Sequence, residues 1–402
     1  MDALTHSLTS RAADSGGSWK ELPKVKLQRK NRLRALSLGA VAVSGALALT
    51  ACGSDNNNDG ASSTSSASAK AAGSVKCDNA KGNLLASGST AQQNAMGQWS
   101  KDFMGACSGV QINYKGVGSG AGIQEFLQGN TAFAGSDSAL KPEEITQSKK
   151  VCSGGQAIDL PMVGGPIAII YNLDGVDNLT LDAPTLAKIF DSKIKKWNDP
   201  AIAKLNPGVK LPDLAIQAYH RTEDSGTTDN FTKYLKAAAP SDWKYSGGKS
   251  WQAKGGQSAQ GSSGVAAGVK QTNGAIGYDE LSYATSNKLQ MAQLNTGAAQ
   301  PVALTTDSAS KAIAAAKIVG TNGDLSLQLD YATKADGAWP IVLVTYEIVC
   351  DKGNKADTLP TTKAFLNYIS SEDAQSKLAD QSYAPLPTEI ATKVRSAISN
   401  IS

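Results

Sequence analysis

Three short segments rich in glycine and hydroxyl-bearing residues stand where a predicted strand passes into a predicted helix. They are residues 88–91 (GSTA), 118–122 (GSGAG) and 224–227 (DSGT). A helix N-terminus exposes unpaired backbone N–H groups and the positive end of the helix dipole, and small residues let an oxyanion come close to them. Each segment alone also fits a capped tight turn, and Ile123 breaks the dinucleotide fingerprint of the second one. Together, the three segments predict an anion site.

Arg221 strengthens this prediction. It ends the predicted strand 215–221 and stands four residues before Ser225, so its guanidinium is placed to form a bidentate pair with two oxygens of one anion. Glu223, two positions later, is expected to hold the guanidinium in place if the strand continues. The alternative is a surface pair of Arg221 and Glu223, which would contribute little to stability.

Asp137 is the residue expected to select among anions. It follows the predicted strand 132–134. An ionised carboxylate only accepts hydrogen bonds, so it suits an anion that carries a proton and repels a fully deprotonated one such as sulfate. Taken alone, Asp137 is better explained as a turn or cap residue. Only its occurrence together with the three anion-type segments and Arg221 favours the selective role.

The elements that must position these residues alternate between strands and helices. Strands are expected at 84–86, 110–114, 132–134, 157–171, 215–221, 275–278 and 341–349. Helices are expected at 91–104 with Thr90 as N-cap, at 119–128, 185–190, 226–238 after Ser225, 308–318 and from 357 onward with a break near Pro385 and Pro387, whereas 246–264 is expected to be irregular. This alternation predicts an α/β fold in which strand 157–171 crosses between domains.

The N-terminal part of the chain carries the pattern of an export signal. A basic run at 24–34 precedes the apolar stretch 35–49, which has the length of a signal-peptide core and is short for a membrane span. The following residues, Leu49-Thr50-Ala51-Cys52, resemble the bacterial lipobox, which implies cleavage before Cys52 and attachment of diacylglycerol to it. An ordinary signal peptide with a chance cysteine is the alternative. Residues 53–74 are nearly all small or polar and predict a flexible tether.

Charge and histidine content exclude several function classes. The net charge of +4 is concentrated in residues 1–51, which hold eight basic and three acidic residues, so the remainder gives no support for nucleic-acid binding. The only histidines are His6 and His220. A catalytic triad would need His220, which points to the opposite face of its strand from Arg221. One such histidine also leaves no usual zinc set, and a purely adhesive protein would not need this anion site.

Four further cysteines, Cys77, Cys107, Cys152 and Cys350, follow the export pattern. An even number outside the cytoplasm indicates two disulfides, for which three pairings exist. We favour Cys77–Cys107, because the first residue would open one predicted strand and the second would precede its neighbour, and this leaves Cys152–Cys350. Four buried free thiols are the alternative.

Several long motifs resemble the family of phosphate-binding components (PstS) of high-affinity phosphate ABC transporters. They occur in the family's order over roughly residues 83 to 402, at 114–122, 133–137, 189–191, 197–202, 205–209, 220–228, 274–278 and 383–387. The resemblance implies a two-lobed class II periplasmic-binding-protein fold, in which each lobe is a mixed β-sheet flanked by helices and the ligand lies in a central cleft. We expect a signal peptide at 1–51, a lipidated Cys and tether at 52–82, lobe I at 83–170 plus 337–402, and lobe II at 171–336.

The resemblance also implies a set of phosphate ligands. By position they are Thr90, Ala91, Ser119, Asp137, Arg221, Ser225, Gly226 and Thr227. Two positions depart from the family pattern: Ala91 replaces a usual phenylalanine and Glu223 replaces a usual aspartate beside the arginine. The implied partners are inorganic phosphate, the permease subunits of the importer and the membrane through Cys52, with no cofactor, metal or nucleic acid. Sulfate and molybdate disagree with Asp137, whereas arsenate carries a proton as phosphate does and stays an alternative ligand.

The lipobox interpretation predicts that Cys52→Ser abolishes acylation and membrane retention, because the thiol that would carry the lipid is lost. Labelling of cells with a fatty-acid probe, followed by membrane fractionation, measures both. The neighbouring tether variant Ser54→Ala should keep the label and the membrane attachment. Continued labelling of Cys52→Ser would refute the interpretation.

Overall fold

The computed structural model describes residues 75–402. The expected signal peptide, Cys52 and tether residues 53–74 lie outside the described residues. The folded part begins earlier than the expected end of the tether at residue 82. Cys77 is bonded to Cys107, and the backbone N–H of Lys81 donates to Thr361 Oγ1 at 2.9 Å.

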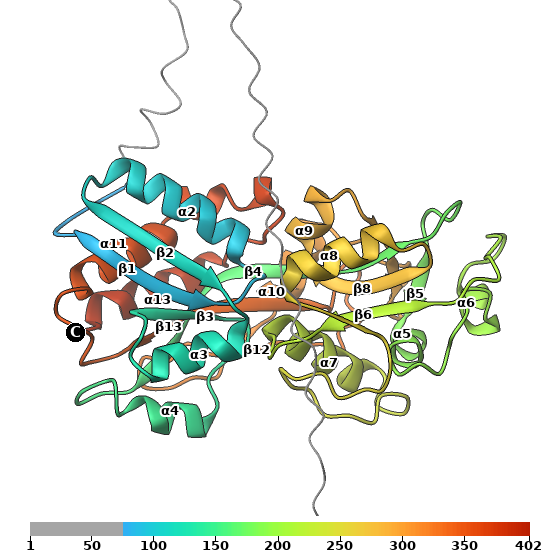
Figure 1. The fold of residues 1–402 in the computed structure, drawn as a ribbon, viewed down its shortest axis with the longest axis horizontal. Helices are drawn as coiled ribbons and strands as arrows, with labels where there is room; N and C mark the ends of the chain where they lie inside the picture. The colour runs from blue at the N-terminus through green and yellow to red at the C-terminus, as the bar shows by residue number, and fades with distance from the viewer. Residues whose placement is uncertain (1–74) are drawn as a thin grey trace, which may run out of the picture. The chain divides into compact units, whose positions relative to one another are not determined.

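The strands of two lobes follow one another along a single hydrogen-bonded path (Figure 1). Its order is β2 (Val110–Gly116), β1 (Gly82–Gly88), β3 (Phe133–Ser136), β13 (Val342–Cys350), β4 (Ala157–Asn172), β8 (Ala275–Glu280), β6 (Gln217–Arg221) and β7 (Gln257–Ala259), with β9 (Gln290–Met291) also on β4. Parallel pairs, such as β1–β2 and β6–β8, occur at both ends, and the central pairs β13–β4 and β4–β8 are antiparallel. Each lobe therefore has a mixed sheet.

Strand β4 connects the lobes. Its first part, up to Pro166, pairs with β13 in lobe I, and its second part, from Ile167, pairs with β8 in lobe II. The strand is buried along almost its whole length, which explains why it reads as a continuous run of apolar and β-branched residues. The expected crossing strand is confirmed.

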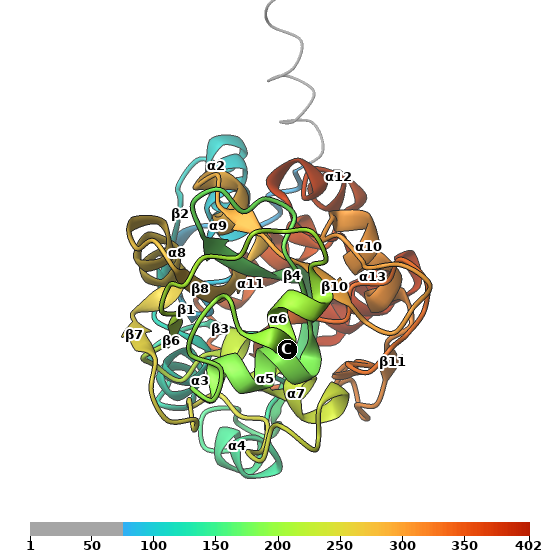
Figure 2. The same cartoon turned by 90° about the vertical axis from the view of Figure 1, so that its right-hand side faces the viewer.

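Helices cover both faces of each sheet (Figures 1 and 2). In lobe I, α2 (Gln93–Ala106), α11 (Leu359–Ile369) and α13 (Thr388–Asn400) lie across the sheet from α3 (Ser119–Leu127) and α4 (Pro142–Ser148), and the short helices α12 (Glu372–Ser376) and η1 (Ala379–Gln381) precede α13. In lobe II, α8 (Gly261–Gln271) and α9 (Leu281–Ser286) lie across the sheet from α5 (Ala183–Phe190) and α7 (Gly226–Ala238), with α6 (Pro200–Leu205) at the far end. The small pair β5 (Thr180–Asp182) and β10 (Gln293–Asn295) completes lobe II.

The segment that contains α10 (Thr306–Ala314), β11 (Lys317–Ile318) and β12 (Leu327–Gln328) was expected in lobe II. Its contacts are with the lobe I part of the crossing strands. The N–H of Leu325 donates to the carbonyl of Asp159 at 3.0 Å, and the N–H of Leu327 donates to Tyr346 Oη at 3.0 Å. We therefore propose that residues 306–328 belong with lobe I, which would move the second expected lobe boundary from 337 to before residue 306; the first boundary, near 170, stays a prediction.

Several expected elements differ locally. Helix α2 begins at Gln93 with Gln92 as N-cap, so the expectation of Thr90 as the cap is wrong. Helix α10 ends at Ala314 because residues 317–318 pair with β12. The region 246–264 was expected to be irregular, but it contains β7 and the start of α8. By contrast, α3 begins at Ser119 and α7 follows Ser225, as expected.

Both favoured disulfides are present. Cys77 and Cys107 are joined with Cα atoms 5.4 Å apart, and Cys152 and Cys350 with Cα atoms 5.3 Å apart. The first ties the residues before β1 to the end of α2, and the second ties the segment before β4 to the end of β13. The alternative of four free thiols is wrong. Among residues 75–402, no helix is both long and apolar enough to cross a membrane.

Candidate functional site

The guanidinium of Arg221 is buried where the two lobes meet. Arg221 is 2% exposed at the end of β6. Its Nη2 donates to Thr90 Oγ1 at 2.7 Å, and its Nη1 lies 3.4 Å from both Thr227 Oγ1 and Ser262 Oγ. Its Nε has no hydrogen-bond partner among the described residues. Because a buried donor without a partner is costly, this N–H is available to an acceptor that enters the site.

Glu223 holds the guanidinium from lobe II, as predicted. Its Oε1 forms an ion pair with Arg221 Nη2, and its Oε2 accepts from the N–H of Gly261 at 3.3 Å. The side chains of Arg221 and Glu223 are 1% and 12% exposed, so the alternative of a surface pair is wrong. The longer arm of glutamate reaches the arginine because Gly118 leaves room, since a Cβ there would lie 2.7 Å from Glu223 Cγ.

Asp137 lies directly after β3 and is 4% exposed. Thr345 Oγ1 donates to its Oδ1 at 2.8 Å, and Ser119 Oγ donates to its Oδ2 at 3.3 Å. Burial raises the pKa of Asp137, while hydrogen bonds from Ser89, Thr345 and Ser119 and the charge of Arg221 oppose that rise. The carboxyl group is thus held in a fixed orientation at the lobe contact.

The backbones of the two lobes approach closely at glycines. The N–H of Gly226 in lobe II donates to Ser119 Oγ in lobe I at 3.2 Å, and the N–H of Gly120 donates to the carbonyl of Asp224 at 3.0 Å. A Cβ at Gly226 would lie 2.5 Å from Asp137 Cβ and 2.6 Å from Ser119 Oγ. The N-termini of α3 and α7 therefore face each other across this contact, with their positive dipole ends directed at the same small region.

A second buried carboxyl group lies near Arg221. Asp279, fully buried on β8 beside β6, has its pKa raised to about 8 by burial, although the charge of Arg221 opposes this shift. Glu223 is the carboxylate that contacts the guanidinium directly. Within residues 75–402, no group of three or more His, Cys, Asp or Glu is placed to hold a metal ion. The arrangement offers donors from Arg221, hydroxyls and backbone N–H groups, with Asp137 as an acceptor.

Comparison with known proteins places this chain in a family. The family model described as a PBP superfamily domain matches residues 62–373. Phosphate-binding protein PstS 3 of Mycobacterium tuberculosis is 45% identical over 364 residues, which covers 90% of this chain and 97% of the relative. The chain belongs to the PstS family of phosphate-binding proteins. PstS 2 of the same organism is 42% identical over 368 residues, with 90% and 97% covered.

Solved structures agree on the fold of this PstS family member. A high-affinity periplasmic phosphate-binding protein, PfluDING, solved with bound phosphate, matches with a TM-score of 0.64 at 21% identity, and covers 78% of this chain and 93% of its own. A phosphate ABC transporter substrate-binding protein from Clostridium perfringens, also with bound phosphate, matches with a TM-score of 0.54 at 18% identity, covering 76% and 100%. The expected two-lobed periplasmic-binding-protein fold is confirmed.

The structure brings most of the predicted site residues of this PstS family member together. Thr90, Ser119, Asp137, Gly226 and Thr227 contact one another or Arg221 directly. Two others have their polar groups engaged locally. The N–H of Ala91 donates to Ser89 Oγ at 3.0 Å, and Ser225 Oγ accepts from the N–H of Thr228 at 3.3 Å as the N-cap of α7.

His220 lies away from this cluster, as the alternation along β6 predicts. Its ring stacks on Trp251 with centroids 4.8 Å apart. Its Nδ1 lies 3.0 Å from the carbonyl of Arg221. Burial lowers its pKa, so the ring is held in a neutral form. The geometry gives Ser225 no histidine partner.

Sequence reasoning missed Ser262 and Thr345. Ser262, at the start of α8, lies 3.1 Å from Thr90 Oγ1 through its hydroxyl, and its N–H donates to the same oxygen at 3.2 Å. A signal for it existed, because residues 261–264 (GSSG) form a fourth Gly/Ser-rich segment, here at the start of a helix. No local signal marks Thr345, which reaches Asp137 from the neighbouring strand β13.

The glycine contact predicts that Gly226→Ala forces the lobes apart. Its new Cβ would overlap Asp137 and Ser119, and overpacking of this kind costs about 1–3 kcal/mol. The overlap occurs only when the lobes are in contact, so the substitution should destabilise the closed arrangement relative to an open one. Small-angle X-ray scattering should show a larger radius of gyration for the variant. Gly97→Ala, in a part of α2 with no atom within 4 Å of the added Cβ, is the control. A profile unchanged from the parent would contradict the prediction.

Proposed function

We propose that this protein captures inorganic phosphate between its lobes and delivers it to a phosphate ABC importer. The observation that carries the proposal is the meeting of one buried guanidinium and one buried carboxyl with the N-termini of α3 and α7 at the lobe contact. Donors dominate such a region, and a tetrahedral oxyanion can accept from all of them. The names of the relatives, which are phosphate-binding proteins, agree with this chemistry.

The predicted ligands would divide the phosphate oxygens among them. Arg221 binds two phosphate oxygens through Nε and an Nη group. The hydroxyls of Thr90, Ser119, Ser225 and Thr227 donate to the remaining oxygens, together with backbone N–H groups at Ala91, Gly226 and Thr227. Several of these donors now bond to each other, as Gly226 does to Ser119. Phosphate would replace those protein–protein contacts, so entry requires the lobes to separate and then close on the ligand.

Asp137 supplies the selectivity in this proposal. Its ionised form accepts a hydrogen bond from the P–OH group of a protonated phosphate, and repels sulfate, which has no proton to donate. Thr345 and Ser119 hold the carboxyl in the orientation needed. Arsenate carries the same proton and would be accepted on this basis.

We also propose that the protein works outside the cytoplasm as a lipid-anchored binder and carries out no catalysis. The export pattern and Cys52 support the anchor. The stacking of His220 on Trp251 supports the non-catalytic role, because it removes the only histidine of the described residues from Ser225. Permease subunits of the importer are the proposed partners that receive the phosphate.

Titration calorimetry with phosphate and with sulfate tests the proposed function. The parent protein should bind phosphate and reject sulfate. Arg221→Ala should weaken phosphate binding by at least about 100-fold, because breaking a buried charged pair by removing one partner costs about 3–5 kcal/mol. Arg395→Ala, on α13, removes an arginine whose hydrogen bonds lie in lobe I far along the chain from the site, and should bind as the parent does. Unchanged phosphate affinity in Arg221→Ala would overturn the proposal.

The role of Asp137 predicts a pH-dependent selectivity. As pH falls through the raised pKa of Asp137, its carboxyl gains a proton and becomes a donor, so rejection of sulfate should weaken toward acid pH. Asp137→Asn, whose amide always donates, should accept sulfate with little pH dependence, at least about tenfold more tightly than the parent at neutral pH. Competition assays with both anions between pH 5 and 8, with the exposed-site variant Asp307→Asn as control, measure the effect. If Asp137→Asn rejects sulfate as the parent does, Asp137 does not sense the proton of the ligand.

A further inference from the structure

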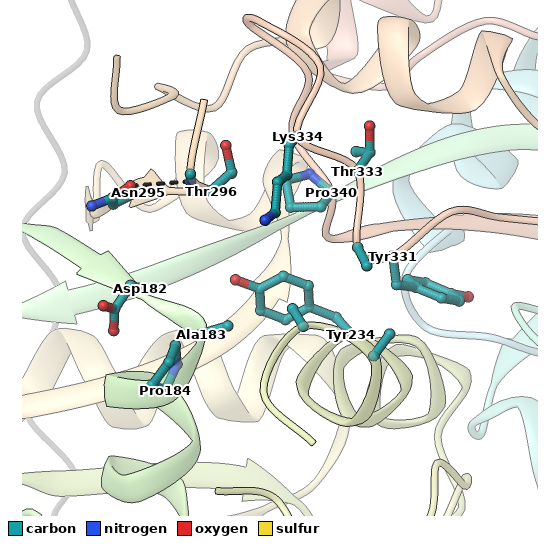
Figure 3. Close-up of a pocket in the computed structure, with 14 residues that line it drawn as sticks. Asp182, Ala183, Pro184, Tyr234, Asn295, Thr296, Tyr331, Thr333, Lys334 and Pro340 are labelled. Carbon is teal, nitrogen blue, oxygen red and sulfur yellow. Dashed lines mark hydrogen bonds between the residues drawn. The ribbon is translucent and has the colours of Figure 1, made fainter. Parts of the chain in front are cut away.

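Lobe II contains a second pocket, separate from the anion site, with a volume of about 440 Å³ (Figure 3). It is formed by the end of β5 and the start of α5, the last turns of α7, the residues after β10 and the segment 331–340. None of the proposed phosphate ligands lines it. Its volume lies in the range of small-molecule sites, which is about 300–1,000 Å³.

Tyr234 is the first sign that this pocket is built to hold a ligand. The residue is 2% exposed, and its hydroxyl points into the pocket (Figure 3). That hydroxyl forms no hydrogen bond with any described residue. Solvent or a ligand in the pocket is therefore its available partner. Burial, followed by the charge of Asp182, raises the pKa of Tyr234, so the group stays a neutral donor and acceptor.

Two opposite charges line the same pocket without pairing. Asp182 uses Oδ1 to cap α5 by accepting from the N–H of Thr185 at 2.8 Å, which leaves its second oxygen without a partner in the described part of the chain. Lys334 lies beside Gly297, and its ammonium forms no ion pair or hydrogen bond with residues 75–402. In Figure 3 the Tyr234 hydroxyl is directed at the space between Asp182 and Lys334.

The remaining walls are mixed, with Asn295, Thr296 and Thr333 beside proline and alanine side chains. Pro184 and Pro340 line two sides, and Ala237 and Ala238 contribute small methyl groups from α7. The last turn of a helix carries the negative end of its dipole, which favours a cation near the Ala237–Ala238 side. A ligand suited to the pocket therefore has a cationic end and an anionic end.

We propose that this pocket binds a small zwitterion of the amino-acid or short-peptide class. Its ammonium would donate to the free oxygen of Asp182 and to Tyr234 Oη, and its carboxylate would accept from the ammonium of Lys334. Such a ligand satisfies all three groups at once. A neutral sugar would leave both charges unneutralised, and a simple anion or cation would leave one of them so.

Calorimetry and saturation-transfer NMR on the full chain test this proposal. The probes are the twenty amino acids and a set of alanyl and glycyl dipeptides, with glucose as the neutral comparison. At least one zwitterion should bind. Its two charge-deleted analogues (for leucine, 3-methylbutylamine and 4-methylpentanoate) should bind at least about tenfold more weakly, as expected for loss of one hydrogen-bonded charge.

Two variants assign the binding to the pocket. Tyr234→Phe removes only the unpaired hydroxyl, so the free energy of unfolding should not fall, yet zwitterion binding should weaken about tenfold. Lys334→Gln should weaken it similarly, whereas the matched surface variant Lys317→Gln should not. Phosphate titrations of the same variants should match the parent, which keeps this proposal separate from the phosphate site. The proposal would be overturned if no zwitterion binds or if glucose binds instead. It would also be overturned if both pocket variants bind the zwitterion as the parent does.

Discussion

The burial of one guanidinium is the constraint on which the site depends. A cation removed from water is costly unless it is paired and hydrogen-bonded on all sides. Arg221 meets most of that requirement with partners from both lobes, and only its Nε is without one in the described part of the chain. The partners are Glu223, Thr227 and Ser262 from lobe II, and Thr90 from lobe I. The closed contact between the lobes is therefore part of what solvates the arginine. An oxyanion that enters can take over this solvation, which makes ligand binding and lobe closure two aspects of the same electrostatic balance.

Close approach of two backbones is the second constraint, and it explains the glycines at the contact. Gly118 adopts φ of +92° and leaves space for Glu223, while Gly120 and Gly226 bring main-chain N–H groups up to the opposite lobe. A side chain at Gly226 would occupy the region between Asp137 and Ser119. The Gly/Ser-rich segments thus serve packing between lobes and exposure of donors together, because the same absence of side chains allows both.

The sequence allowed the charged part of the site to be predicted better than its hydroxyl part. Arg221, Glu223 and Asp137 stand at strand ends, where local order along the chain already indicates a common edge of the sheet. Thr90 was assigned to a helix cap on local grounds, but its oxygen is bound by Arg221 and Ser262. That outcome depends on β6, β7 and α8 lying side by side, which is a matter of strand order. Residues 261–264 were expected to be irregular because glycine and serine lower helix propensity. Tertiary packing forms α8 there nonetheless.

The crossing strands connect this site to the relation between the lobes. Strand β13 pairs with β4 along the lobe I part, and the register between them shifts between Thr345 and Tyr346. A bulge of this kind bends the strand and redirects a side chain. Here Thr345 is the residue before the shift, and its hydroxyl donates to Asp137. Any movement of the lobes must pass through β4 and its neighbour, because β4 belongs to both sheets. The hydrogen bond from Thr345 therefore links the Asp137 carboxyl to the strand pair that connects the lobes, while Ser119 holds its other oxygen from α3.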